Sequence, residues 1–206
     1  ETGVGVYELD TPGHSIHDVW IEDGIAYSSN WADGIVAVDI GAKKHKESDR
    51  SKSQFNPLLA KAGQGSPSNP VKLAEMKDPT GRNHAAFPYL NEETGQFYII
   101  GGDENFPWGV QATKNKPSNP RGGYHFMNFT DPNNPREDAI YEVPEAGSHN
   151  LWIYGDILLA GNYQGGLRIV DISGELLGDI YKQGREIAHY LSCLLYTSPS
   201  PRDGIG

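Results

Sequence analysis

The chain contains an internal repeat without gaps, in which residues 17–40 align with residues 149–172. Both segments carry a first His, a Trp-Ile pair, a central Ile, an Asn, a Gly and a closing Val-Asp-Ile. A looser copy begins at His84, runs through residues 97–103 and resumes after an insertion at residues 123–129. Self-similarity at a nearly constant spacing is the signature of a repeat architecture.

Each copy has the pattern of short β-strands joined by tight turns. Asp23-Gly24 is a two-residue hairpin signal between apolar runs, and Gly155-Asp156 takes the same place in the last copy. A third strand ends near Ile40 in the first copy and near Ile172 in the last. Fourth strands are expected at residues 71–76, 139–143 and 176–180. Four antiparallel strands per repeated unit is typical of β-propeller blades.

The sequence therefore predicts an all-β fold, a β-propeller fragment of about three four-stranded blades that belongs to a larger ring. An open β-sandwich is the main alternative. The expected divisions, in chain order, are residues 1–9 as the last strand of a preceding blade, 10–76 as a blade with a long solvated loop at 42–70, 77–143 as a blade with an insertion at 104–122, and 144–191 as a third blade.

Composition narrows the class of protein further. The chain has 25 Gly and 14 Pro among 206 residues, which disfavours a helical bundle. Its net charge of −10 argues against nucleic acid as the main partner. No apolar run is long enough to span a membrane.

Residues 192–206 contain the string Cys-Leu-Leu-Tyr-Thr-Ser-Pro-Ser-Pro-Arg-Asp from Cys193 onward, which resembles a translated sequencing adapter. We interpret this segment as non-native and exclude it from the fold. Cys193 is the only cysteine, so the rest of the chain offers no disulfide and no thiolate ligand.

Three segments carry a resemblance to a known family. Residues 33–41, 124–132 and 165–173 are similar to LVIVD repeats, although the middle copy has Asn128 where the others have Asp39 and Asp171. That family occurs in bacterial and archaeal cell-surface or secreted proteins expected to form propellers. The resemblance implies a propeller at an extracellular or cell-surface location, but it implies no particular chemistry.

The hairpins predict a polar pair at the start of each blade. Counting back along each ladder from its turn places a histidine opposite an amide or carboxylate, with Cβ atoms about 5 Å apart. If the first strand of each blade is innermost, the pairs form an arc at the mouth of the central channel. The predicted pairs are His17 with Asn30, His84 with Asp103, and His149 with Asn162.

Two functions are consistent with this arc. The first is a secreted or cell-surface binding or scaffold module that uses the His-bearing face and an aromatic turn at Phe106 and Trp108 in the insertion. Its partner would be a protein, a glycan or a small molecule. The alternative is a metal-dependent enzyme in which His17, His84 and His149 hold a transition metal ion, because neutral imidazoles suit Zn, Cu, Fe or Ni.

A purely structural interpretation competes with both functions. Every blade of a propeller has the same junction with its neighbour, so a repeated His could be a hydrogen-bonded strut in each junction. Fold alone does not locate function. The positions of the imidazole nitrogens distinguish the two, because ligands converge on one point whereas struts lie in separate junctions.

Overall fold

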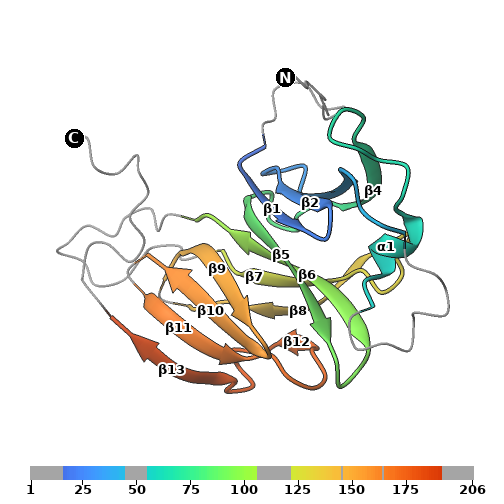
Figure 1. Ribbon diagram of the computed structural model, residues 1–206. Coiled ribbons are helices and arrows are strands. Elements are labelled where there is room, and N and C mark those ends of the chain that lie inside the picture. Colours follow the sequence, from blue (N-terminus) through green and yellow to red (C-terminus); the bar gives the residue numbers. More distant parts are fainter. Residues whose placement is uncertain (1–15, 45–54, 106–121, 145, 164, 192–206) are drawn as a thin grey trace, which may run out of the picture.

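The computed structural model describes residues 16–44, 55–105, 122–144, 146–163 and 165–191. These residues form three β-sheets that lie side by side, as blades do in a propeller (Figure 1). The predicted all-β class is confirmed, and no closed ring is formed by the described residues.

The first sheet has the order β1-β2-β3-β4 and is antiparallel throughout. Its strands are β1 (Asp18–Glu22), β2 (Ile25–Ser29), β3 (Ile35–Asp39) and β4 (Val71–Met76), and a short helix, α1 (Pro57–Lys61), lies between β3 and β4 in the chain. The fourth strand predicted at residues 71–76 is therefore confirmed.

The second sheet has the order β12-β8-β7-β6-β5, and the third has the order β13-β11-β10-β9. The second comprises β5 (Asn83–Asn91), β6 (Gln96–Asp103), β7 (Tyr124–Asn128), β8 (Arg136–Tyr141) and the short parallel strand β12 (Gly178–Asp179). The third comprises β9 (Ser148–Tyr154), β10 (Ile157–Asn162), β11 (Gly166–Asp171) and β13 (Glu186–Tyr190).

The fourth strand expected at residues 176–180 was wrong. Its residues pair through β12 with β8 of the second sheet, and β13 takes the fourth place in the third sheet. The reason is burial, because Leu176 and Ile180 lie in the same apolar cluster as Tyr141 of β8. Pairing there removes two large side chains from water, whereas β13 is largely exposed.

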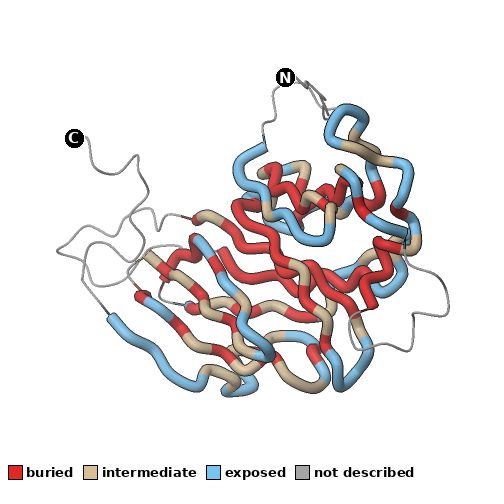
Figure 2. Tube along the Cα trace, viewed as in Figure 1, coloured by how far each residue is buried: buried red, intermediate tan, exposed pale blue. Residues whose placement is uncertain are grey.

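Two apolar cores separate the three sheets, and the second sheet contributes to both. Along β6, Phe97 and Ile99 face the core shared with the first sheet, whereas Tyr98 and Ile100 face the core shared with the third. This alternation follows from the two-residue period of a strand. Figure 2 accordingly shows β5, β6 and β7 of the middle sheet almost wholly buried, as expected of strands covered on both faces.

The hairpin turns form as the sequence predicts. Asp23 and Gly24 have φ angles of 51° and 77°, the positive values that a primed two-residue turn requires. The expected closing pairs Glu22–Ile25, Asn91–Gln96 and Tyr154–Ile157 are all present. The hairpins therefore place the starts of β1, β5 and β9 at the opposite ends of the strands from their turns.

The solvated loop expected at residues 42–70 is more ordered than predicted where the structure describes it. Leu58 and Leu59 of α1 are buried in the core of the first and second sheets. Asp39 holds the described parts of this loop in place. Its carboxylate accepts hydrogen bonds from five backbone N–H groups, those of Gly41, Ala42, Gly63, Gln64 and Gly65. Burial opposes ionisation of Asp39, but these hydrogen bonds lower its pKa to about 2.

Candidate metal centre

The first strands of the three sheets lie next to one another, since β1 contacts β5 and β5 contacts β9. The repeated histidine directly precedes β1 and is the second residue of β5 and of β9, so the three imidazoles come together at one end of these strands. The ring centroids of His17 and His84 are 4.3 Å apart, and those of His84 and His149 are 4.4 Å apart. The structure thus brings the three predicted histidines into one cluster.

β-Bulges place the histidines away from their predicted partners. In the second sheet Asn83, not His84, pairs with Asp103, and the register shifts before Ala85. In the third sheet Asn162 pairs with Ser148 instead of His149. The predicted register was therefore wrong by one residue at both positions. A bulge inserts one extra residue and redirects its side chain, which is how His84 is aimed at the cluster.

The first sheet has no register shift between β1 and β2. Their ladder ends at Asp18–Ser29, one pair short of the predicted His17–Asn30 pair, and the N–H of His17 donates to the carbonyl of Ser29 at 2.7 Å. Asn30 lies just beyond that pair. Its amide nitrogen donates to the carbonyls of Ser28 and Gly34, so it stabilises the turn between β2 and β3.

The other two predicted partners also serve their own strand ends. The side-chain amide of Asn162 donates to the carbonyl of Ala160. Asp103 accepts a hydrogen bond from the Thr80 hydroxyl and contacts His125. Phe106 and Trp108, the predicted aromatic turn, lie outside the described residues.

Glu104 is the residue that sequence reasoning missed. Its Oε2 is 3.2 Å from Nε2 of His17 and 3.9 Å from Nε2 of His84, and its Oε1 is 3.6 Å from Nε2 of His149. One carboxylate therefore faces all three imidazoles. His17, His84 and Glu104 each offer a ligand atom within 4.8 Å of the others.

A signal for Glu104 was present in the repeat. In the first and third copies the residue after the conserved Asn is aromatic, Trp31 or Tyr163, and the corresponding residue after Asp103 is Glu104. All three positions border the cluster. The ring of Trp31 lies 4.5 Å from that of His17, and the ring of Tyr163 stacks on His149 at 5.0 Å.

The cluster is thus an arc of five rings in the order Trp31, His17, His84, His149 and Tyr163, with one carboxylate facing it. The hydroxyl of Tyr163 donates to Oε1 of Glu104 at 2.5 Å. We call this set of six residues the imidazole arc.

Hydrogen bonds of the main chain fix Glu104 at the base of the insertion. Its N–H donates to the carbonyl of Arg82, and the N–H of Asn105 donates to the carbonyl of Ser148. Asp103 is tied to Gly123 by its own N–H. The second and third sheets therefore hold this carboxylate, which favours a site with a defined geometry.

One side of the imidazole arc is open to solvent. The side chains of His84 and His149 are 9% and 8% exposed, whereas those of His17 and Glu104 are 29% and 26% exposed. A ligand can therefore approach Glu104 and His17 while His84 and His149 form the inner wall.

Electrostatics keep the inner histidine neutral and the glutamate ionised. Burial, followed by the neighbouring His149 and His17, lowers the pKa of His84 to about 4. For Glu104, burial raises the pKa, but the hydrogen bond from Tyr163 and the nearby His84 and His149 outweigh it, so its pKa is lowered. Near neutral pH the arc thus offers a neutral imidazole and a carboxylate, the protonation states that metal binding requires.

A second cluster, comprising Asp78, Asp103 and His125, is buried behind Glu104. His125 uses both ring nitrogens, with Nε2 3.2 Å from Asp103 and Nδ1 2.5 Å from Glu137. Burial opposes protonation of His125, but these carboxylates raise its pKa to about 10. Both ring nitrogens of His125 therefore face carboxylates, and the cluster forms an ion network that holds Asp103 in place.

Below the imidazole arc the same strands place a second tier of aromatic rings on the inner side of the sheets. Trp20 lies 4.3 Å from Phe87 and 5.1 Å from Trp152 between ring centroids. Each of these rings follows its histidine by three residues, a spacing that would place them about 10 Å along the strand.

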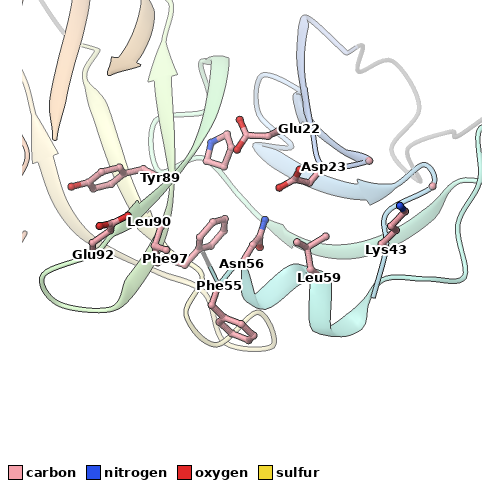
Figure 3. A pocket seen from close by; sticks show the side chains of 13 residues that line it. Glu22, Asp23, Lys43, Phe55, Asn56, Leu59, Tyr89, Leu90, Glu92 and Phe97 are labelled. Atoms are coloured by element: carbon pink, nitrogen blue, oxygen red, sulfur yellow. The ribbon is translucent and has the colours of Figure 1, made fainter. Parts of the chain in front are cut away.

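A cavity of about 860 Å³ lies between the first and second sheets, at the hairpin ends of the strands (Figure 3). Glu22 and Asp23 border it on one side and Tyr89 and Glu92 on the other. Its walls are completed by Gly24, Gly41, Lys43, Phe55, Asn56, Leu59, Pro88, Leu90 and Phe97. The histidines begin these strands, so the cavity and the imidazole arc lie at opposite ends of the sheets.

The distances from Glu104 to the imidazole nitrogens are compatible with a transition metal. With bonds of 2.0–2.2 Å, tetrahedral ligand atoms lie roughly 3.4 Å apart. The three distances, 3.2, 3.6 and 3.9 Å, lie on either side of that value. His17, His84 and Glu104 are the described residues whose ligand atoms lie close enough together to hold a metal, and Nε2 of His149 lies beside the other oxygen of the same carboxylate.

No helix in the described ranges has the length and apolar character that crossing a membrane requires. Comparison of the chain with protein-family models, with curated proteins and with solved structures finds no match.

Proposed function

We propose that the chain is a binding module whose His-bearing face takes a divalent first-row transition metal ion. The ligands are Nε2 of His17, His84 and His149 and the carboxylate of Glu104. The observation that carries this proposal is the contact of one carboxylate with all three imidazoles. Three imidazoles and a carboxylate suit Zn, Cu, Fe or Ni rather than Mg or Ca.

Two features favour a ligand site over a set of struts. Repetition of a junction accounts for a His in every blade, but it does not account for a glutamate in the middle copy where the other copies have Trp31 and Tyr163. In addition, Nδ1 of His84 is buried without a hydrogen-bond partner among the residues that the structure describes. A strut would be expected to use that nitrogen.

The location and family are proposed on separate grounds. The resemblance to LVIVD repeats supports a secreted or cell-surface bacterial protein, and the blade-like sheets are compatible with it. A metal on the open side of the imidazole arc would be accessible there to an extracellular ligand.

Metal analysis tests the proposal directly. The chain is exposed to Zn²⁺, Co²⁺, Ni²⁺ and Cu²⁺ in turn, freed of unbound ions and measured by plasma mass spectrometry. We expect about one ion per chain, and loss of that ion in a combined His17→Ala, His84→Ala and His149→Ala variant and in Glu104→Gln.

His189→Ala is the matched control, because His189 is an exposed histidine of β13 that contacts Glu186. It should keep the ion. Circular dichroism of each variant separates loss of ligands from loss of fold. A folded parent chain that retains none of the four ions would refute the proposal.

A metal-dependent enzyme is the second candidate, and the open side at His17 and Glu104 favours it. Catalysis needs a coordination position that substrate or water can occupy. The visible spectrum of the Co²⁺-loaded chain reports this, because a fifth ligand weakens the intense tetrahedral bands. A spectrum that no added anion changes would favour a closed binding site.

A further inference from the structure

We propose that the open side of this metal site takes a planar monoanion, bound through a carboxylate oxygen to the metal and flanked by the rings of Trp31 and Tyr163. This inference rests on the proposed function, and it names the ligand class that the site would accept.

The two ends of the imidazole arc provide the geometry. Trp31 and Tyr163 are the repeat-equivalent aromatic residues that follow Asn30 and Asn162, and both are half-buried. Each stacks on or leans against a terminal imidazole, Trp31 on His17 and Tyr163 on His149. Glu104 therefore lies between the Tyr163 hydroxyl at its Oε1 and His17, with the Trp31 ring beside it, at its Oε2, so a ligand that reaches a metal at Glu104 from solvent would meet both aromatic residues.

Trp31 is held in an uncommon backbone conformation. Its φ angle is 51°, in the left-handed region that a bulky side chain rarely adopts. The N–H of Trp31 donates to the carbonyl of Asn83 in β5. This hydrogen bond anchors the backbone of Trp31 to the second sheet and so fixes its conformation. Strain of this kind is retained where the surrounding structure imposes it, and it is common at ligand sites.

Charge selects the sign of the ligand. A divalent ion with neutral imidazoles and one carboxylate keeps one positive charge, which a monoanion would neutralise. The flanking rings select its shape, because offset or edge-on contacts with aromatic side chains favour a flat ring over a small aliphatic group. An aromatic carboxylate meets both requirements.

The experiment compares benzoate with acetate, two monoanions that differ in the ring. The Co²⁺-loaded chain is titrated with each, and the dissociation constant is read from the visible spectrum. We expect benzoate to bind about tenfold more tightly, a difference that two aromatic contacts supply. Equal dissociation constants would overturn the inference.

Two variants test whether the Trp31 ring causes the difference in affinity between benzoate and acetate. Trp31→Asn tolerates the left-handed backbone and removes the ring, so it should reduce the benzoate preference to about threefold or less and leave acetate binding nearly unchanged. Trp152→Leu, in the lower aromatic tier, is the control and should keep the full preference. A preference that survives Trp31→Asn would overturn the role of Trp31.

Metal content measured beforehand separates the two proposals. If the parent chain retains no Co²⁺, the metal site itself fails, and with it this inference. If Co²⁺ is retained but benzoate leaves the spectrum unchanged, the metal site stands and the planar-anion inference is wrong.

Discussion

The hydroxyl of Tyr163 lies 2.5 Å from Oε1 of Glu104 while its ring stacks on His149, so one side chain orients two members of the imidazole arc. Glu104 follows β6 of the second sheet, whereas His149 lies in β9 and Tyr163 follows β10, both in the third sheet. The contact therefore fixes the carboxylate across a junction between sheets.

Removal of this hydroxyl should weaken metal binding without removing a ligand. Tyr163→Phe keeps the ring that stacks on His149 but removes the hydrogen bond that Glu104 accepts from the Tyr163 hydroxyl. Loss of such a supporting contact typically costs 10–100-fold in metal affinity. Isothermal titration with Co²⁺ measures the change, with Tyr190→Phe, an exposed tyrosine of β13, as the control. An unchanged affinity would mean that Tyr163 does not position the carboxylate.

The ion pairs of His125 should make stability decline in alkaline solution. The pKa of His125 is about 10 in the folded chain and about 6.5 when unfolded. A raised pKa stabilises the fold fully below pH 6.5, and this contribution is lost as the pH rises to 10. We expect the free energy of unfolding to fall across that interval.

His125→Gln should lower stability at pH 6 and abolish most of this decline. Each pKa unit of difference corresponds to about 1.4 kcal/mol. Urea unfolding between pH 6 and 10 provides the measurement. A variant with the same slope as the parent would show that other groups cause the decline.

Ionisation of Asp78 should destabilise the fold, whereas an ordinary hydrogen-bonded carboxylate stabilises the fold when it ionises. Burial, followed by the adjacent Asp103, raises its pKa to about 6. The folded chain therefore holds this proton more tightly than the unfolded chain, and stability falls as the pH rises from about 4 to 6.

Asp78→Asn removes that penalty, so it should raise the midpoint of thermal unfolding at pH 8 and change it much less at pH 4. A gain on the order of 1–3 kcal/mol is expected from the size of the shift. Glu93→Gln, an exposed carboxylate in the β5–β6 hairpin, is the control. Destabilisation by Asp78→Asn at pH 8 would contradict this account.

The sequence predicts the sheets well because strands and tight turns are local features. Asp23-Gly24 determines its hairpin, and the repeat reveals which residues occupy equivalent positions. The same repeat predicts that His17, His84 and His149 come together. It does not reveal the bulges at His84 and His149, because an extra unpaired residue leaves no mark in the apolar pattern.

Two further features could not be predicted because they depend on contacts between residues that are distant in the sequence. β12 joins the second sheet because Leu176 and Ile180 find a core there that is distant in sequence. Glu104 is the first residue of the insertion predicted at residues 104–122, and the insertion obscures its equivalence to Trp31 and Tyr163 in the repeat. Only the three-dimensional structure shows that its carboxylate faces the histidines.

The carboxylates that close the third strands should differ greatly in their importance for folding. Asp39 collects five backbone N–H donors from a loop in the first sheet, whereas the equivalent Asp171 accepts one backbone N–H and one hydroxyl, both from Ser173. In Asp39→Asn the amide group must replace one carboxylate oxygen, so it turns a donor toward other donors. Hydrogen bonds to charged groups contribute about 1.5–3 kcal/mol each, and buried donors without acceptors cost a similar amount.

We therefore expect Asp39→Asn to lower the free energy of unfolding by at least 2 kcal/mol at pH 7, and Asp171→Asn to lower it by about 1 kcal/mol, as measured by urea unfolding. Equal losses in the two variants would mean that the number of loop donors does not determine the contribution of this carboxylate.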